Sequence, residues 1–118
     1  MRPETEAERA ERRAATSAAY RQLVDPAAPP KMPHLLEHHF FAPDEGDMTG
    51  LIHKLEELGF HVESFAYDPD HPSRTWTLTV VRIELLEERR LLAVSDELDT
   101  LARVHDVTYD GWVTRVEQ

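Results

Sequence analysis

Residues Asp44–Gly59 read DEGDMTGLIHKLEELG. Asp44 is a typical N-cap residue, and the apolar side chains after it recur every three or four positions, as one face of a helix requires: Met48, Leu51, Ile52, Leu55 and Leu58. Asp47 lies in the first turn, and Gly59 directly follows the apolar series, where a helix commonly ends in a left-handed residue. This stretch therefore predicts a helix with two defined ends.

The segments on both sides of this helix have the character of strands. Leu35–Phe41 is short, lies between two prolines and ends in aromatic residues. Phe60–Tyr67 is rich in strand-forming residues, and the turn-rich segment Asp68–Ser73 separates it from Trp76–Val80. Trp76–Val80 alternates between apolar and polar residues, which predicts a strand with one buried face. Phe60–Tyr67 and Trp76–Val80 should form a hairpin.

The C-terminal part predicts a second helix and a last strand. Between Glu87 and His105 the recurring positions are Leu91, Val94, Leu98, Leu101, Ala102 and His105. Thr108–Val116 follows as a strand in which Asp110-Gly111 marks a bend or a bulge.

The resulting order is β-α-β-β-α-β, which predicts an α+β, ferredoxin-like fold. In this arrangement two helices cover one face of an antiparallel four-stranded sheet and leave the other face free as a binding surface. Right-handed crossovers favour central positions for the first and last strands. We therefore expect the strands of His38 and Trp112 to be neighbours or one strand apart.

The N-terminal segment Glu4–Leu23 consists mostly of helix formers, and its apolar residues have helical spacing: Ala7, Ala10, Ala14, Ala18 and Tyr20. Alanine buries little area, so this helix docks on the domain, pairs with another copy or frays, and the sequence leaves all three open. The proline-rich segment Asp25–Pro30 ends the helix and forms a linker. We divide the chain into residues 1–30, the helix and linker, and residues 31–118, the domain.

Charge and composition restrict the class of protein. The 118-residue chain has a formal charge of -10, and since residues 1–30 carry five basic and five acidic residues, the whole excess lies in residues 31–118. An acidic field repels phosphate backbones, so direct nucleic-acid binding is not expected. A basic protein partner suits this field; the alternative is that the acidic surface only maintains solubility.

The absence of cysteine excludes disulfides and thiolate chemistry. With neither a membrane-length apolar run nor a signal peptide, the chain is expected in the cytoplasm, without membrane contact.

No pattern in the sequence predicts catalysis, a metal site or a cofactor. Seven histidines are present, but His38 and His39 are adjacent on a strand and should point to opposite faces, and the sequence contains no His-Glu-x-x-His pattern. Asp68 and Asp70 are explained by the turn they build. The chain also contains no Gly-x-Ser-x-Gly elbow and no glycine-rich phosphate loop.

The segment Tyr109-Asp110-Gly111-Trp112 is unusual because a glycine weakens a strand unless backbone or a partner must approach closely. Two interpretations remain open. The first is a bulge in which Trp112 enters the core while Asp110 accepts backbone donors. The second is an aromatic anchor on the open face of the sheet, in keeping with the enrichment of Trp and Tyr at interfaces.

Together with this segment, three further stretches resemble the regulator of ribonuclease activity B family, bacterial protein inhibitors of ribonuclease E. They are His38-His39-Phe40-Phe41, the run from Leu55 to Phe60, and the strand that begins at Trp76. The resemblance covers His34 to Val116 and leaves out the helical extension before Lys31. It implies a ferredoxin-like fold and a protein that binds the endoribonuclease itself, modulating RNA turnover without acting on RNA.

We therefore predict an acidic protein-binding module that resembles a ribonuclease E inhibitor, is not an enzyme and needs no cofactor. The predicted partner-binding residues are Tyr109, Asp110, Gly111, Trp112, His39 and Phe41, acting from the open sheet face. The alternative is a self-associating structural or interaction domain with a different protein partner, assembled as a homo-oligomer through the N-terminal helix.

Overall fold

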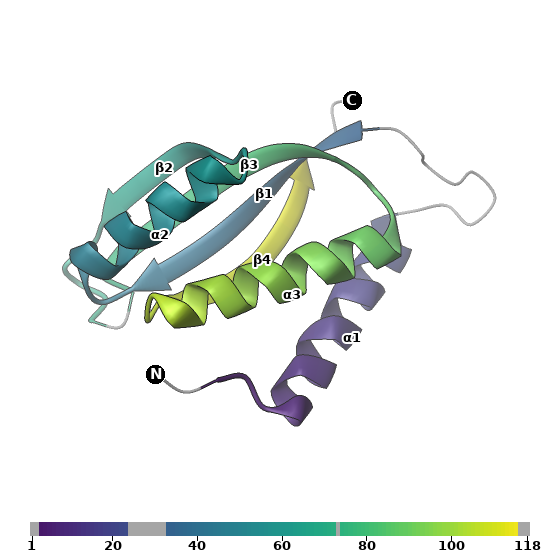
Figure 1. The fold of residues 1–118 in the computed structure, drawn as a ribbon, viewed down its shortest axis with the longest axis horizontal. Coiled ribbons are helices and arrows are strands. Elements are labelled where there is room, and N and C mark those ends of the chain that lie inside the picture. Colours follow the sequence, from purple (N-terminus) through teal and green to yellow (C-terminus); the bar gives the residue numbers. More distant parts are fainter. Residues whose placement is uncertain (1–2, 24–32, 73, 116–118) are drawn as a thin grey trace.

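Four antiparallel strands form one sheet in the order β2-β3-β1-β4. The computed structural model describes residues 3–23, 33–72 and 74–115, and Figure 1 shows its elements. In chain order they are α1 (Glu6–Leu23), β1 (Pro33–Ala42), α2 (Glu45–Glu57), β2 (His61–Tyr67), β3 (Trp76–Leu85), α3 (Glu88–Val104) and β4 (Thr108–Arg115). All six elements that the sequence predicts after the linker are present, in the predicted order.

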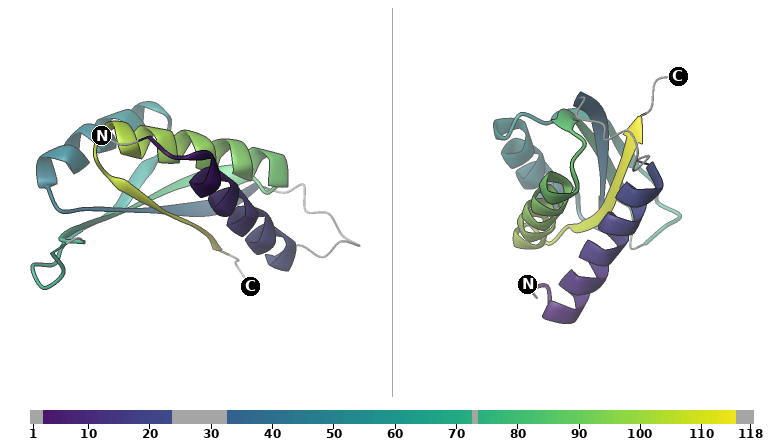
Figure 2. Two further views of the ribbon diagram at one scale, coloured as in Figure 1. Left: turned by 90° about the horizontal axis from the view of Figure 1, so that it is seen from below. Right: turned by 90° about the vertical axis from the view of Figure 1, so that its right-hand side faces the viewer.

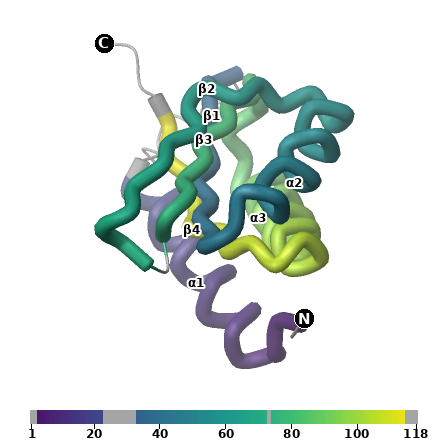
Figure 3. The backbone as a smooth tube through the Cα atoms, turned by 90° about the vertical axis from the view of Figure 1, so that its left-hand side faces the viewer, coloured from purple at the N-terminus to yellow at the C-terminus, as the bar shows by residue number. Residues whose placement is uncertain are grey.

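β1 and β3 occupy the centre of the sheet, and β2 and β4 form its edges. The prediction that the last strand lies centrally is therefore wrong. The predicted proximity of the two marked strands is confirmed, because β4 pairs with β1 and His38 lies opposite Trp112. The turn between β2 and β3 bends away from the helices (Figures 2 and 3). In it the Asp68 side chain accepts a hydrogen bond from the Asp70 amide at 3.1 Å, as expected of an Asp-Pro turn.

α2 and α3 cover the same face of the sheet (Figure 2). Strand alternation sends Leu36, Phe40 and Ala42 of β1 towards these helices, and all three are buried. The main core joins them to the predicted helix positions, of which the following are almost fully buried: Met48, Leu51, Leu55, Leu98 and Ala102. Burying a Leu or Met side chain contributes roughly 1.5 to 3 kcal/mol, so this layer supplies much of the stability.

The central strands are longer than the sequence predicts. β1 begins at Pro33 and ends at Ala42, and β3 continues five residues beyond Val80. The extension of β3 escaped prediction because Arg82 and Glu84 interrupt the apolar alternation although both point to the helix-covered face, opposite Leu36 and His34. The predicted linker Asp25–Pro30 lies outside the described residues.

α1 docks on α3 and the β4 edge, which answers one of the questions the sequence leaves open (Figure 2). The predicted alanine stripe does not form the docked face of α1, because Ala7, Ala10, Ala14 and Ala18 are all exposed. The docked face instead carries Thr16, which is buried, with Arg12, Ala19 and Tyr20 half-buried around it.

Arg12 holds α1 to α3 through a bridged set of hydrogen bonds. Its guanidinium donates to Glu4 at 2.8 and 3.0 Å, to Ser95 Oγ at 2.9 Å and to Asp96. Arg13 also donates to Asp96. The hydrogen bonds from Arg12 lower the pKa of Glu4. Polar contacts thus replace the apolar seam expected for this helix.

Both core helices end in the same hydrogen-bonded motif, but with different residues in the left-handed position. After α2, Gly59 has φ +90°, and the amides of Gly59 and Phe60 donate to Glu56 and Leu55 at 3.0 Å. After α3, the left-handed residue is Asp106, with φ 57°. A residue with a Cβ is strained in this region, whereas glycine is not.

The two helix ends therefore predict opposite effects on stability. Gly59→Ala should lower the free energy of unfolding by about 1 kcal/mol, and Asp106→Gly should raise it by about 0.5 kcal/mol, because the relief of strain is partly offset by glycine's greater freedom in the unfolded chain. Urea unfolding monitored by circular dichroism measures both. Equal stability of Gly59→Ala and the unmodified protein would contradict the assigned backbone strain.

Candidate partner-binding site

A bulge in β4 decides where the predicted binding residues point. Phe40 lies opposite Tyr109 and His38 lies opposite Trp112, so two residues of β4, Asp110 and Gly111, fall opposite one residue of β1, and the register shifts there. Gly111, within the bulge, has φ +97°, and a Cβ added to it would meet nothing within 4 Å. The glycine is thus required by the backbone conformation and not by crowding within the described chain.

The bulge places Tyr109 and Trp112 on the same, helix-covered face. Tyr109 is 8% exposed and belongs to the main core. Trp112 is partly buried against the second core cluster, whose members are Leu36, Leu86 and Leu91 with Tyr20 beside them, and its Nε1 lies 3.5 Å from Thr16 Oγ1 of α1. The interpretation that placed these two aromatics on the open face of the sheet is therefore wrong. The other interpretation holds in part: β4 does bulge, and Trp112 packs, partly buried, against the second core cluster.

Asp110, Phe41 and His39 lie together with Arg74 and Thr79 on the open side of the sheet. One interpretation expected Asp110 to accept backbone donors, but within residues 3–23, 33–72 and 74–115 its carboxylate accepts from a side chain, Arg74 Nη1, at 3.2 Å. The Arg74 guanidinium also lies 4.0 Å from the centre of the Phe41 ring, a cation–π contact. His39 Nδ1 lies 3.2 Å from Thr79 Oγ1. The six predicted residues thus divide between the two faces of the sheet.

A buried polar network extends from Tyr109 beneath α3. The Tyr109 hydroxyl lies 2.9 Å from His38 Nδ1, and His38 Nε2 lies 3.6 Å from Glu84 Oε2, beyond direct hydrogen-bond distance. Arg82 donates to Glu84 at 2.6 Å and stacks on the Phe60 ring. As predicted, His38 and His39 point to opposite faces. Within this network the sequence offered no sign that His38 and Glu84 would meet.

Burial sets the protonation of this network. Desolvation lowers the pKa of His38 and outweighs the opposing effect of Glu84, so the imidazole is neutral. Burial alone would raise the pKa of Glu84, but the contacts with His38 and Arg82 outweigh it and the net effect is lower, which keeps the carboxylate ionised. Burial also raises the pKa of the Tyr109 hydroxyl. Glu84 and Arg82 therefore form the ion pair of the network, and His38 is its neutral member.

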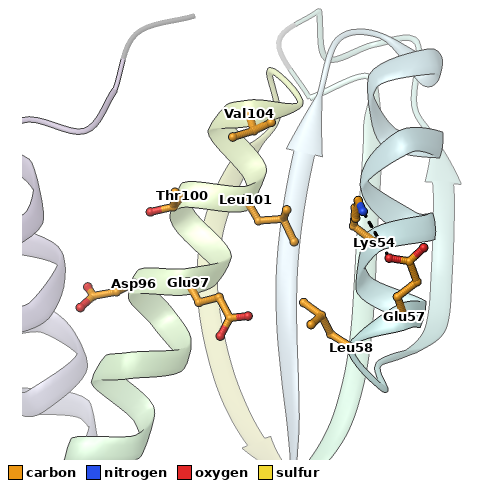
Figure 4. A pocket seen from close by; sticks show the side chains of 8 residues that line it. All are labelled: Lys54, Glu57, Leu58, Asp96, Glu97, Thr100, Leu101 and Val104. Carbon is orange, nitrogen blue, oxygen red and sulfur yellow. Dashed lines mark hydrogen bonds and ion pairs between the residues drawn. The ribbon is translucent and has the colours of Figure 1, made fainter.

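Two of the hollows on the helical side of the molecule concern the candidate site. One, of about 310 Å³, lies between α1, α3 and β4, and is lined by all four residues of Tyr109–Trp112 together with Arg12 and Thr16. The other, of about 680 Å³, lies along α3 and α2 (Figure 4), and we call it the α2–α3 groove. Its lining residues are Lys54, Glu57, Leu58, Asp96, Glu97, Thr100, Leu101 and Val104.

Helical periodicity does not predict the α2–α3 groove. Leu58 and Leu101 were assigned to the buried stripes of their helices, yet Leu58 is 41% exposed and Leu101 is only half-buried. In Figure 4 these two side chains point towards each other from the two helices. The signal was present in α2, because Leu58 is the last apolar position of the series and lies at the helix end, where the core no longer covers it.

The described residues contain no arrangement suited to metal chemistry. Across residues 3–23, 33–72 and 74–115, no three His, Asp or Glu side chains come together as potential ligands of one ion. No helix in the same ranges has the length and apolar character needed to cross a membrane. What the hollows and the open face offer is contact surface.

The neutral, buried His38 predicts a specific loss of stability in acid. Because its folded-state pKa lies below the unfolded value of about 6.5, the unfolded chain binds the extra proton first, and the free energy of unfolding falls as pH drops below that value. In His38→Gln this slope should be smaller, by at most about 1.4 kcal/mol per pH unit. Urea unfolding from pH 7.5 to 5.0 measures it.

His53→Gln is the control for this measurement, because it removes one histidine from an exposed position of α2. If His38→Gln and the unmodified protein had the same pH slope, the neutral state of His38 would be ruled out as a source of acid sensitivity.

Comparison with known proteins provides the identity of the chain. The family model described as "Regulator of ribonuclease activity B" matches residues 13–114, which is most of the chain, including the second half of α1 and every strand. The match confirms the predicted resemblance and starts earlier than His34, so the helical extension is not wholly outside it. No curated protein matches the chain at a significant level. The chain belongs to the regulator of ribonuclease activity B family.

Proposed function

We propose that this chain modulates RNA turnover by binding an endoribonuclease of the ribonuclease E type, in the cytoplasm, as a protein-binding module without catalysis of its own. The observation that carries the proposal is the family match over residues 13–114, because the family is one of regulators of ribonuclease activity. The match includes the docked part of α1 as well as the sheet.

The charge distribution supports a protein partner over direct contact with RNA. The acidic excess lies in residues 31–118, which contain the sheet and both core helices. Phosphate contacts require clusters of lysine and arginine. Of the arginines in the described part of the chain, Arg12, Arg13, Arg74 and Arg82 are each engaged with a carboxylate of this same chain.

We also infer that the domain is ferredoxin-like. Support comes from the order β-α-β-β-α-β and from the pairing, in which β3 lies between β1 and β2 and β1 lies between β3 and β4. Such a domain leaves one face of its sheet without helices. Asp110, Phe41 and His39 occupy that face.

Among the six predicted residues we assign direct contact with the partner to Asp110, Phe41 and His39. Tyr109, Gly111 and Trp112 act indirectly, because they set the course of β4 and the seat of α1. This division makes two kinds of variant separable: those that change the open face and those that change the packing beneath α1.

Capture of the partner tests the function. The intact protein, immobilised and exposed to a lysate of its native cell with and without ribonuclease treatment, should retain the endoribonuclease in both conditions, because the contact is between proteins. Adding the purified protein should then slow RNA cleavage by that enzyme. Recovery of the endoribonuclease only in untreated lysate would mean an RNA bridge and would reject the proposal. Recovery of the chain alone would favour the self-association alternative, for which the exposed alanines of α1 offer a surface.

Charge reversal on the open face tests the assigned contact residues. Asp110→Lys should reduce capture about tenfold, a typical interface effect, with unfolding free energy changed by less than about 0.5 kcal/mol because Asp110 is exposed. Trp112→Phe should retain capture, since a smaller ring still packs against Leu36.

Asp70→Lys is the matched control, because it makes the same charge change at an exposed position of the neighbouring turn. An equal loss of capture in Asp70→Lys and Asp110→Lys would attribute the effect to overall charge and remove Asp110 from the contact.

A further inference from the structure

We propose that the α2–α3 groove binds a helical segment of the partner in which apolar residues are flanked by lysines and arginines. The identity of the partner rests on the proposed function. The chemistry of the segment follows from the groove itself.

The floor of the groove is apolar and uncovered. Val104 is 60% exposed and Leu58 41% exposed, and Leu101 lies half-buried between them. Leu101 and Val104 are three residues apart on α3, and therefore on one face of it. Neighbouring apolar side chains left in water are a typical mark of an interaction site.

The rim of the groove carries a carboxylate on each side, with Lys54 beside Glu57 on α2. Glu57 borders it from α2 and Glu97 from α3, and Figure 4 shows the Glu97 carboxylate turned towards α2. Glu57 is paired with Lys54 at 3.3 Å, whereas Glu97 has no ion-pair partner among residues 3–23, 33–72 and 74–115. An apolar floor between carboxylates selects a segment with apolar residues at its centre and cations at its margins.

The geometry favours a helix as the occupant. α2 and α3 lie on the same face of the sheet, and a third helix can pack its ridges into the furrow between two others. Such an occupant presents apolar residues at i, i+3 or i+4, and i+7 to the floor and its flanking lysines to the rim. A second copy of this chain is a poorer match, because it carries the same acidic excess.

A peptide of defined chemistry tests the groove. The probe is an amidated peptide of about 16 residues, roughly 24 Å as a helix, with leucines along one face and lysines elsewhere. Fluorescence anisotropy with the full chain should give saturable binding. Leu58→Glu and Val104→Glu should each weaken it by at least about tenfold. Ile83→Glu, at a 67% exposed aliphatic position on the opposite face of the sheet, should leave it within about twofold.

The controls separate apolar contact from charge. Val104→Glu and Ile83→Glu make the protein acidic to the same extent, and general attraction to a cationic peptide would increase in both. A loss in Val104→Glu alone therefore reports contact in the groove. A second peptide of equal composition, with its leucines spread around the helix, should bind at least about tenfold more weakly.

Three outcomes would overturn the inference. Equal binding by all variants places the peptide elsewhere, and equal binding of both peptides reduces the interaction to charge. A protein that is dimeric in solution and becomes monomeric in Val104→Glu would assign the groove to a second copy.

Capture of the endoribonuclease separates the two proposals: if unmodified protein and Val104→Glu capture it equally, the groove fails and the function stands. If neither captures it while the peptide still requires Val104, the function fails and the groove stands.

Discussion

The backbone of Gly111 is the constraint on which the arrangement of this molecule depends. A strand sends successive side chains to opposite faces, so Tyr109 and Trp112, three positions apart, would normally face opposite ways. The bulge at Gly111 adds one residue and turns both aromatics towards the helices. Tyr109 thereby reaches His38 in the main core, and Trp112 closes the second cluster, on which Tyr20 of α1 rests. The shape of the last strand thus contributes to the docking of the N-terminal helix, which Arg12 also holds to α3.

Polar contacts, as well as the apolar core, hold the elements of this molecule together. Glu84 is 3% exposed and remains ionised because its contacts with His38 and Arg82 lower its pKa. Arg12 joins α1 to α3, because it donates to Glu4, just before α1, and to Ser95 of α3. Much of the cationic charge of the chain is consumed in these internal contacts. Each of these arginines also neutralises a carboxylate, so the formal charge of the chain stays at -10, and this acidic excess suits a basic partner.

The sequence predicts those features of the fold that depend on local chemistry. Asp44, the apolar series from Met48 and Gly59 define α2 at both ends, and the order of elements follows from similar signals. Features set by long-range contact escape it. The seat of α1 depends on Ser95 and Asp96, more than eighty residues from Arg12, and alanine spacing could not indicate it. The α2–α3 groove escapes for the same reason, because periodicity assigns Leu58 and Leu101 to a core without stating how far apart the two helices lie.

The segment Tyr109–Trp112 marks the family resemblance most clearly, yet three of its four residues work inside the molecule. Tyr109 and Trp112 pack, Gly111 provides the backbone turn, and Asp110 is the exposed member. A motif of this kind identifies an architecture more directly than a binding surface. We therefore propose recognition by surfaces that this architecture positions, which are the open face around Asp110 and Phe41 and the α2–α3 groove behind the sheet. Because these two surfaces lie on opposite sides of the sheet, one partner could engage both only with separate segments.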